Sequence, residues 1–183
     1  LIPGGGYMTR ILSKAVGPTG KVYVFASQPV AREGQPPPAA PVAAITADTA
    51  NYGNVQVVIS NFATIANPEP LDLVWTSQNY HDMHNPGRNL DINAANKAIL
   101  NALKPGGLYI VLDHQSAKGT EFSADLHRID EAKVKAEVLA AGFEFVGSSS
   151  VLRNPADDGA KTIFDPGIRG KTDQFILKFK KPG

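Results

Sequence analysis

Histidine and aspartate side chains carry most of the chemistry that this sequence could perform. The four imidazoles belong to His81, His84, His114 and His127. An imidazole titrates near neutral pH, so it can take a proton from a hydroxyl or an amine, and an adjacent carboxylate can orient the ring. Asp82 follows His81 directly, and Asp113 precedes His114. We therefore expect a catalytic group of His81, Asp82 and His114, in which one of the two histidines is the general base.

Other interpretations of these side chains stay open. Histidines in loops often bind backbone groups without any catalytic role. The run His81-Asp82-Met83-His84 could supply metal ligands, but a metal site needs a second group of ligands, which the sequence does not define. We therefore predict no metal site. Arg128 could bind a carboxylate or phosphate of a substrate, although a salt bridge within the protein is the more common role.

A glycine turn near the start of the chain is a second candidate site. The run Pro3-Gly4-Gly5-Gly6-Tyr7 precedes a segment with helical spacing. Glycines let the backbone approach a ligand closely, and the first turn of a helix offers free N–H groups to polar ligand atoms. A dinucleotide-binding turn would have a third glycine where this chain has Thr9, which disfavours a nicotinamide cofactor. A purely structural turn is the alternative.

The elements that would position these residues alternate along the chain. Residues 22–25, 55–59, 71–76 and 108–112 are apolar and rich in β-branched or aromatic side chains, as strands buried on both faces are. Helical spacing is found in residues 8–16, around 42–52, and in 92–103 and 129–141. Segments such as Lys104-Pro105-Gly106-Gly107 mark helix ends. The pattern predicts an α/β fold with a parallel sheet.

The C-terminal part has a different pattern. Residues 143–152 and 173–179 are strand-like with no helix between them, which predicts an antiparallel pair at the edge of the sheet. Residues 153–171 are rich in proline and glycine and are expected to form a long surface loop, a kind of loop that is often functional. Residues 35–41, with three consecutive prolines, are expected to form a stiff connector.

Composition limits the kinds of partner. A chain of 183 residues with 43% hydrophobic residues can bury one core, so we expect one domain. With 18 Lys and Arg against 17 Asp and Glu, it lacks the basic excess typical of nucleic-acid binding. The absence of cysteine excludes disulfides, thiolate metal sites and a cysteine nucleophile. No apolar stretch is long enough to span a membrane. A soluble domain with a small-molecule substrate is the expectation.

Several segments together resemble a known family. They are Pro3 to Thr9, Gly20-Lys21-Val22-Tyr23-Val24, the run from Asn79 to His84, Leu103 to Gly107, and His127-Arg128-Ile129-Asp130. In order and over nearly the whole chain, they resemble a bacterial family of class I S-adenosylmethionine-dependent methyltransferases. The resemblance implies a Rossmann-like sheet that is mostly parallel with an antiparallel final strand. It also implies S-adenosylmethionine as the cofactor.

The resemblance implies where that cofactor would bind. The first glycine loop would hold its methionine part, and the rim beyond later strands would hold its ribose and adenine. The implied cofactor-binding residues are Pro3, Gly4, Gly5, Gly6, Tyr7, Ser27, Asn61 and Asn79. Two positions depart from the usual pattern, because Ala26 and Asn61 stand where acidic residues are common. The acidic residue before the loop would precede Leu1, so we expect that N-terminal helices and most of the first strand are missing from this sequence.

The expected reaction is direct in-line transfer of a methyl group to a small-molecule acceptor, with positioning as the main source of rate enhancement. Two alternatives stay open. A nicotinamide-dependent oxidoreductase is disfavoured by Thr9 and by Ala26, which replaces an acid that would hold the ribose. A non-catalytic cofactor-binding module of the same fold is compatible with the missing acids at Ala26 and Asn61.

Overall fold

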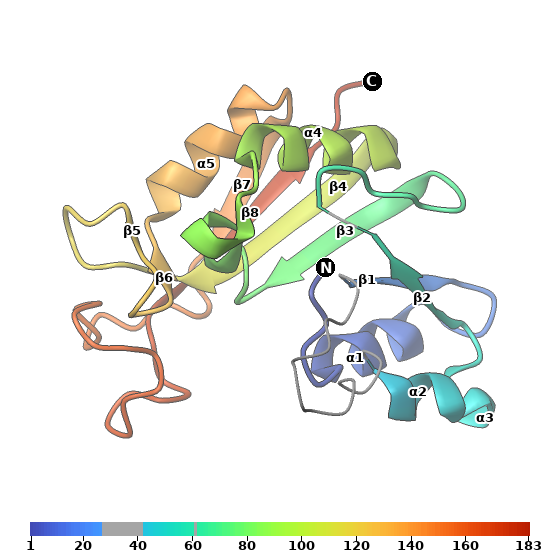
Figure 1. Ribbon diagram of the computed structural model, residues 1–183, viewed down its shortest axis with the longest axis horizontal. Helices are drawn as coiled ribbons and strands as arrows, with labels where there is room; N and C mark the ends of the chain where they lie inside the picture. The colour runs from blue at the N-terminus through green and yellow to red at the C-terminus, as the bar shows by residue number, and fades with distance from the viewer. Residues whose placement is uncertain (27–41, 61) are drawn as a thin grey trace. The chain divides into compact units, whose positions relative to one another are not determined.

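The computed structural model describes residues 1–26, 42–60 and 62–183, and it divides into two units, Leu1–Pro68 and Glu69–Gly183 (Figure 1). Ser27, Asn61 and the segment 35–41 lie outside the described residues, so the expectations for them stay predictions. The expectation of a single domain with a missing N-terminal part also stays a prediction. In the described ranges, no helix combines the length and the apolar character that a membrane span needs.

The first unit is built on two parallel strands. β1 (Val22–Ala26) pairs along its whole length with β2 (Val55–Ile59), and both contain the β-branched residues that favour strands. Helix α1 (Tyr7–Ala15) precedes β1, while α2 (Ala43–Ala47) and α3 (Thr49–Tyr52) precede β2. Apolar side chains from the strands and α2 form the core: Val24, Val42, Ile45 and Val55. The predicted βαβ rhythm is present in this unit.

The single helix expected around residues 42–52 is instead two short helices. They separate at Asp48, whose φ of −89° and ψ of 68° are not helical. Its carboxylate accepts the backbone N–H of Asn51 and so caps α3. Aspartate competes with the helical backbone for hydrogen bonds, which explains why helix α2 ends and α3 begins at this residue.

A four-stranded sheet organises the second unit. Its order is β3 (Leu71–Ser77), β4 (Leu103–His114), β8 (Gln174–Lys180) and β7 (Glu144–Ser149). β3 and β4 are parallel, whereas β8 is antiparallel to both of its neighbours, which confirms the antiparallel pair expected at the sheet edge. Helices α4 (Ile92–Ala102) and α5 (Glu131–Ala140) lie side by side along one face of this sheet (Figure 1).

Strand β4 begins earlier than the sequence suggests. Leu71 pairs with Leu103 and Leu73 with Leu108, so the ladder shifts register across the Lys-Pro-Gly-Gly segment. Gly106, with a φ of 76°, adopts the left-handed conformation that lets this segment turn out of the ladder. The predicted turn is therefore present, but as an irregularity inside the strand, because both of its ends stay paired with β3.

The helix expected over residues 129–141 begins two residues later. Ile129 belongs to β6 (Arg128–Ile129), which pairs with β5 (Phe122–Ser123) in a short hairpin. Asp130 then caps α5, because its side chain accepts the N–H groups of Ala132 and Lys133. Beyond β7, residues 150–173 contain neither helix nor strand, as the proline and glycine content predicts.

Candidate active site

The parallel pairing of β3 and β4 brings together the two segments of the chain that lie at the C-terminal ends of these strands. We call this end of the sheet its carboxyl edge. Ser77, the last residue of β3, pairs with Leu112 near the end of β4. The 3-10 helix η1 (His81–His84) follows β3, while Asp113 and His114 complete β4. The predicted catalytic residues therefore meet at the carboxyl edge, where open parallel sheets bind their ligands.

Asp113 orients the ring of His81. Nδ1 of His81 lies 2.7 Å from Oδ1 of Asp113, and the backbone N–H of His81 donates to Oδ2 at 2.8 Å. The N–H of His114 also donates to Asp113, and all three residues are buried. A carboxylate only accepts hydrogen bonds, so Nδ1 of His81 is the donor in this pair, and in a neutral ring the lone pair is then on Nε2. Asp82 lies toward the other nitrogen, with Oδ1 3.7 Å from Nε2.

A buried polar network fixes η1 to both helices of the second unit. The Tyr80 hydroxyl accepts from Nδ2 of Asn96 at 2.8 Å and donates to Glu137 at 3.1 Å. Nε2 of His84 lies 3.0 Å from the same carboxylate. Burial alone would raise the pKa of Glu137, but hydrogen bonding to His84 and the charges of His84 and Lys133 outweigh it and lower that pKa. The network therefore attaches η1 to α4 through Asn96 and to α5 through Glu137.

His114 is held by the long loop that follows β7. Its Nδ1 lies 2.8 Å from Oγ1 of Thr172, and its ring centroid lies 6.3 Å from that of His81. Burial lowers the pKa of His114 to about 4. With this lowered pKa the ring is neutral near pH 7, and it is a weaker base than an exposed imidazole.

His127 joins this edge from the hairpin between β5 and β6. Its Nδ1 lies 3.9 Å from Oδ1 of Asp82, and its ring meets that of His81 edge-on with centroids 5.4 Å apart. The ring of Phe164, from the long loop, also meets the His127 ring edge-on, with centroids 5.0 Å apart. The sequence-based catalytic group omitted His127, although it is one of the four imidazoles considered from the sequence and part of the segment His127-Arg128-Ile129-Asp130 that resembles the methyltransferase family.

Two other candidates are engaged in the protein itself. Arg128 is fully buried, donates to both oxygens of Asp157 at 2.9 and 3.1 Å, and also donates to two backbone carbonyls. Of the two roles considered for it, the salt bridge is confirmed. Asn79 accepts from the Thr76 hydroxyl and donates to the carbonyl of Ser77, so its side chain stabilises the corner after β3.

The glycine turn lies at the carboxyl edge of the two strands in the first unit. The N–H of Ile2 donates to the carbonyl of Phe25 near the end of β1. Gly6 caps α1 with a φ of 79°, and an added Cβ would clash with Cδ1 of Ile45. A Cβ on Gly5 would meet no described atom within 4 Å, and its φ lies outside the left-handed region. Packing and backbone conformation explain the glycine at position 6 but not at position 5.

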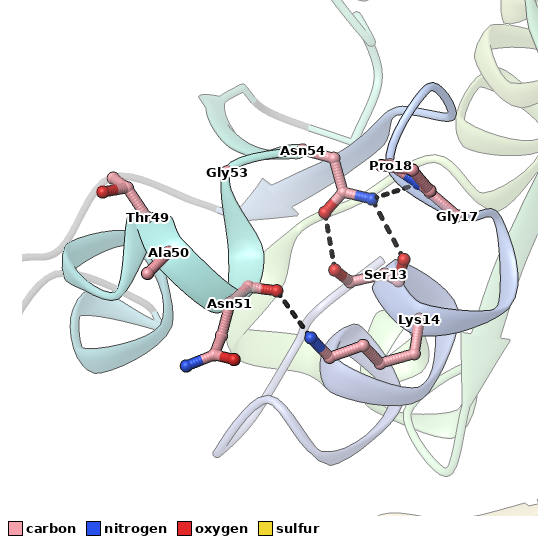
Figure 2. Close-up of a pocket in the computed structure, with 9 residues that line it drawn as sticks. All are labelled: Ser13, Lys14, Gly17, Pro18, Thr49, Ala50, Asn51, Gly53 and Asn54. Atoms are coloured by element: carbon pink, nitrogen blue, oxygen red, sulfur yellow. Dashed lines mark hydrogen bonds between the residues drawn. The ribbon is translucent and has the colours of Figure 1, made fainter.

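A pocket of about 360 Å³ lies in the first unit on the side opposite the carboxyl ends of β1 and β2 (Figure 2). Ser13 donates to Oδ1 of Asn54, whose amide donates to the carbonyls of Ser13 and Gly17. Lys14 donates to the carbonyl of Asn51. Asn54 directly precedes β2, so the pocket lies near the amino ends of the strands. Its hydrogen bonds join α1 to the start of β2, which is a structural role.

Comparison with known proteins identifies the fold of this chain. No protein-family model and no curated protein matches the sequence. A SAM-dependent methyltransferase from Aquifex aeolicus matches with a TM-score of 0.63 and 17% identity, over 98% of this chain and 78% of that one. A putative methyltransferase of Haloferax volcanii, solved with the Trm112 activator, matches with a TM-score of 0.64 and 16% identity, over 99% and 80%. The chain has the class I methyltransferase fold.

The methyltransferase fold also occurs in a protein that is named for another reaction. The [4+2]-cyclase SpnF matches with a TM-score of 0.63 and 16% identity, over 98% of this chain and 73% of that one. The Rossmann-like sheet, mostly parallel with an antiparallel final strand, is thus confirmed. The assignment of a reaction has to come from the residues at the carboxyl edges, because one fold supports several kinds of chemistry.

Proposed function

We propose that this chain is an S-adenosylmethionine-dependent methyltransferase that acts on a small-molecule acceptor. The orientation of His81 on a class I methyltransferase fold is the observation that supports this most. With Nδ1 bound to the buried Asp113, the lone pair of Nε2 is available at the edge where such folds bind ligands. The near-neutral formal charge of +1 favours a small acceptor over a nucleic acid.

We assign the general base to His81 and not to His114. A base works best when its pKa lies near the working pH, and the pKa of about 4 makes His114 a poor proton acceptor. Asp82, whose carboxylate lies 3.7 Å from Nε2 of His81, would stabilise the positive charge that the ring gains with a proton. His114 would serve as a neutral hydrogen-bonding partner for the acceptor.

The glycine turn fits the cofactor. Gly5 leaves open the space that a Cβ would fill, and the neighbouring Tyr7 is 74% exposed, so backbone and ring are both available to a ligand. With them we assign to S-adenosylmethionine the other positions of the first unit that the family resemblance implies: Pro3, Gly4, Gly6, Ser27 and Asn61. The cofactor supplies a methyl group on a positively charged sulfur, ready for in-line displacement.

The residues of the chain then handle the acceptor and its proton. Nε2 of His81 would accept the proton of a hydroxyl or amine as the acceptor oxygen or nitrogen bonds to the methyl carbon and the bond from that carbon to sulfur breaks, with S-adenosylhomocysteine as the second product. The protonated ring, stabilised by Asp113 on one side and Asp82 on the other, releases the proton to solvent afterwards. No covalent intermediate with the protein is required, so positioning supplies most of the acceleration.

Ligand binding tests this proposal against its rivals. S-adenosylmethionine and S-adenosylhomocysteine should each raise the melting temperature, whereas NAD and NADP should leave it unchanged. Thr9 supports this expectation, because its buried side chain occupies the position where a dinucleotide-binding turn needs glycine. Stabilisation by NAD or NADP alone would overturn the methyltransferase assignment. Stabilisation by the two adenosyl compounds without methyl transfer to any of a panel of hydroxyl and amine acceptors would favour the non-catalytic module.

A further inference from the structure

We propose that His81, Asp82 and His127 form a binding site for a divalent first-row transition-metal ion. One ligand atom from each of them lies within 4.8 Å of the other two. The sequence supplied only the cluster at residues 81–84 and lacked a second group of ligands. The fold supplies that group by bringing His127 from the β5–β6 hairpin to η1.

The distances suit a metal ion with little adjustment. Oδ1 of Asp82 lies 3.7 Å from Nε2 of His81 and 3.9 Å from Nδ1 of His127. Ligands that bind one ion at roughly 2.0–2.2 Å lie about 3–4 Å from each other. Small side-chain rotations would therefore bring the three atoms onto a common ion.

The surroundings hold the three side chains in place. The Nδ1–H of His81 donates to a buried carboxylate, that of Asp113, which is the arrangement that orients histidine ligands in metal sites. Nδ2 of Asn85 donates to Oδ1 of Asp82 at 2.9 Å. The His127 ring makes edge-on contacts with the rings of His81 and Phe164. These contacts restrict the rotation of the three side chains before an ion binds, so metal binding costs less conformational entropy.

The ligand types identify the class of ion. Two imidazoles with one carboxylate suit zinc, cobalt or ferrous iron, whereas magnesium and calcium prefer oxygen ligands. His81 is buried, but the side chains of Asp82 and His127 are 26% and 33% exposed, so the site has access to solvent. Three protein ligands leave coordination positions open, as catalytic metal sites do.

Metal binding and the proposed base role use the same lone pair, that of Nε2 of His81. A bound ion therefore excludes proton uptake by this ring while it is present. An acceptor hydroxyl at an open coordination position would instead lose its proton more easily because the ion lowers its pKa. The binding proposal does not depend on methyl transfer, so it is tested without cofactor or acceptor.

Titration calorimetry on tag-free, chelator-treated protein tests the site with Zn²⁺ and Co²⁺. We expect one ion per chain and a visible absorption band for bound Co²⁺. His127→Asn and Asp82→Asn should each weaken binding at least about tenfold. Asparagine suits the left-handed backbone at position 127, where φ is 56°, and preserves the shape of Asp82.

His84→Gln is the matched control, because this histidine lies in the same helix but contacts Glu137. It should bind both ions as the unaltered chain does, and Mg²⁺ or Ca²⁺ at equal concentration should not compete. The proposal is overturned if the unaltered chain binds neither Zn²⁺ nor Co²⁺. It is also overturned if His127→Asn binds as well as the unaltered chain, or if Mg²⁺ competes on equal terms.

Discussion

Asp113 holds His81 by two hydrogen bonds, one from the ring at 2.7 Å and one from the backbone at 2.8 Å. The residues are 32 positions apart in the chain, and they meet because η1 follows β3 while Asp113 ends the adjacent strand β4. One buried carboxylate thus fixes both the position of the residue and the tautomer of its ring.

Asp113→Asn is therefore expected to impair catalysis through His81. An amide nitrogen can donate to Nδ1, which would move the ring proton to Nε2 and remove the lone pair from the acceptor side. Turnover should fall by roughly 10²–10⁴. Nitrogen NMR of the histidine rings should show the change of tautomer without any substrate. An unchanged tautomer with unchanged turnover would contradict the assigned role.

Replacing the ring itself gives a second prediction. His81→Ala should bind S-adenosylhomocysteine as the unaltered chain does, because the proposed cofactor loop is elsewhere in the chain. Turnover should fall by roughly 10²–10⁴, as for a lost general base. Calorimetry and a methyl-transfer assay measure the two effects separately. If the variant loses cofactor affinity and stability but keeps its turnover, His81 has a structural role instead.

The sequence predicted the elements better than the contacts between them. Short runs rich in apolar, β-branched and aromatic residues located β1, β2 and β3, and strand-like composition located the antiparallel pair β7 and β8, because strand propensity is a local property of the sequence. The extended start of β4 was missed, since its pairing with β3 depends on a register shift that no local pattern encodes.

In the candidate site, too, the sequence predicted individual residues better than the contacts between them. His81, Asp82 and His114 were found because each follows or ends a strand, which is a local signal. The pairing of His81 with Asp113 and the approach of His127 depend on how separate segments meet, so sequence spacing could not reveal them. The sequence indicated Asp113 only as the carboxylate next to His114, and not as the partner of His81.

Gly5 and Gly6 form a matched pair for testing the cofactor loop. Gly6→Ala should destabilise the fold by about 2–4 kcal/mol, because its Cβ would clash with Ile45 and its φ of 79° is unfavourable for alanine. Gly5→Ala should leave the melting temperature unchanged but weaken S-adenosylhomocysteine binding by about tenfold, equivalent to about 1.4 kcal/mol. Normal affinity in a folded Gly5→Ala protein would remove the turn from the proposed site.

His114 predicts how stability depends on pH. Its pKa is about 4 in the folded chain, against an ordinary value of 6.5, so between these values the unfolded chain binds the extra proton. Stability from this group is complete above pH 6.5 and decreases as the pH falls toward 4, by roughly 3 kcal/mol in total. Urea unfolding across this range should show a shallower pH dependence for His114→Gln. Identical slopes for both proteins would contradict the lowered pKa.

Arg128 and Arg153 contrast a buried ion pair with an exposed one. Arg128 is fully buried against Asp157, while the side chain of Arg153 is 35% exposed beside Glu131 and Asp173. Arg128→Met should reduce the free energy of unfolding by about 3–5 kcal/mol, because it leaves the buried Asp157 carboxylate without its charged partner and with only the backbone N–H groups of Gly159 and Asp173. Arg153→Met should cost less than about 1 kcal/mol, since exposed pairs are screened by water. Urea unfolding of both variants measures the difference, and equal losses would contradict the prediction, because they would show that the two backbone N–H groups on Asp157 are enough to stabilise its carboxylate.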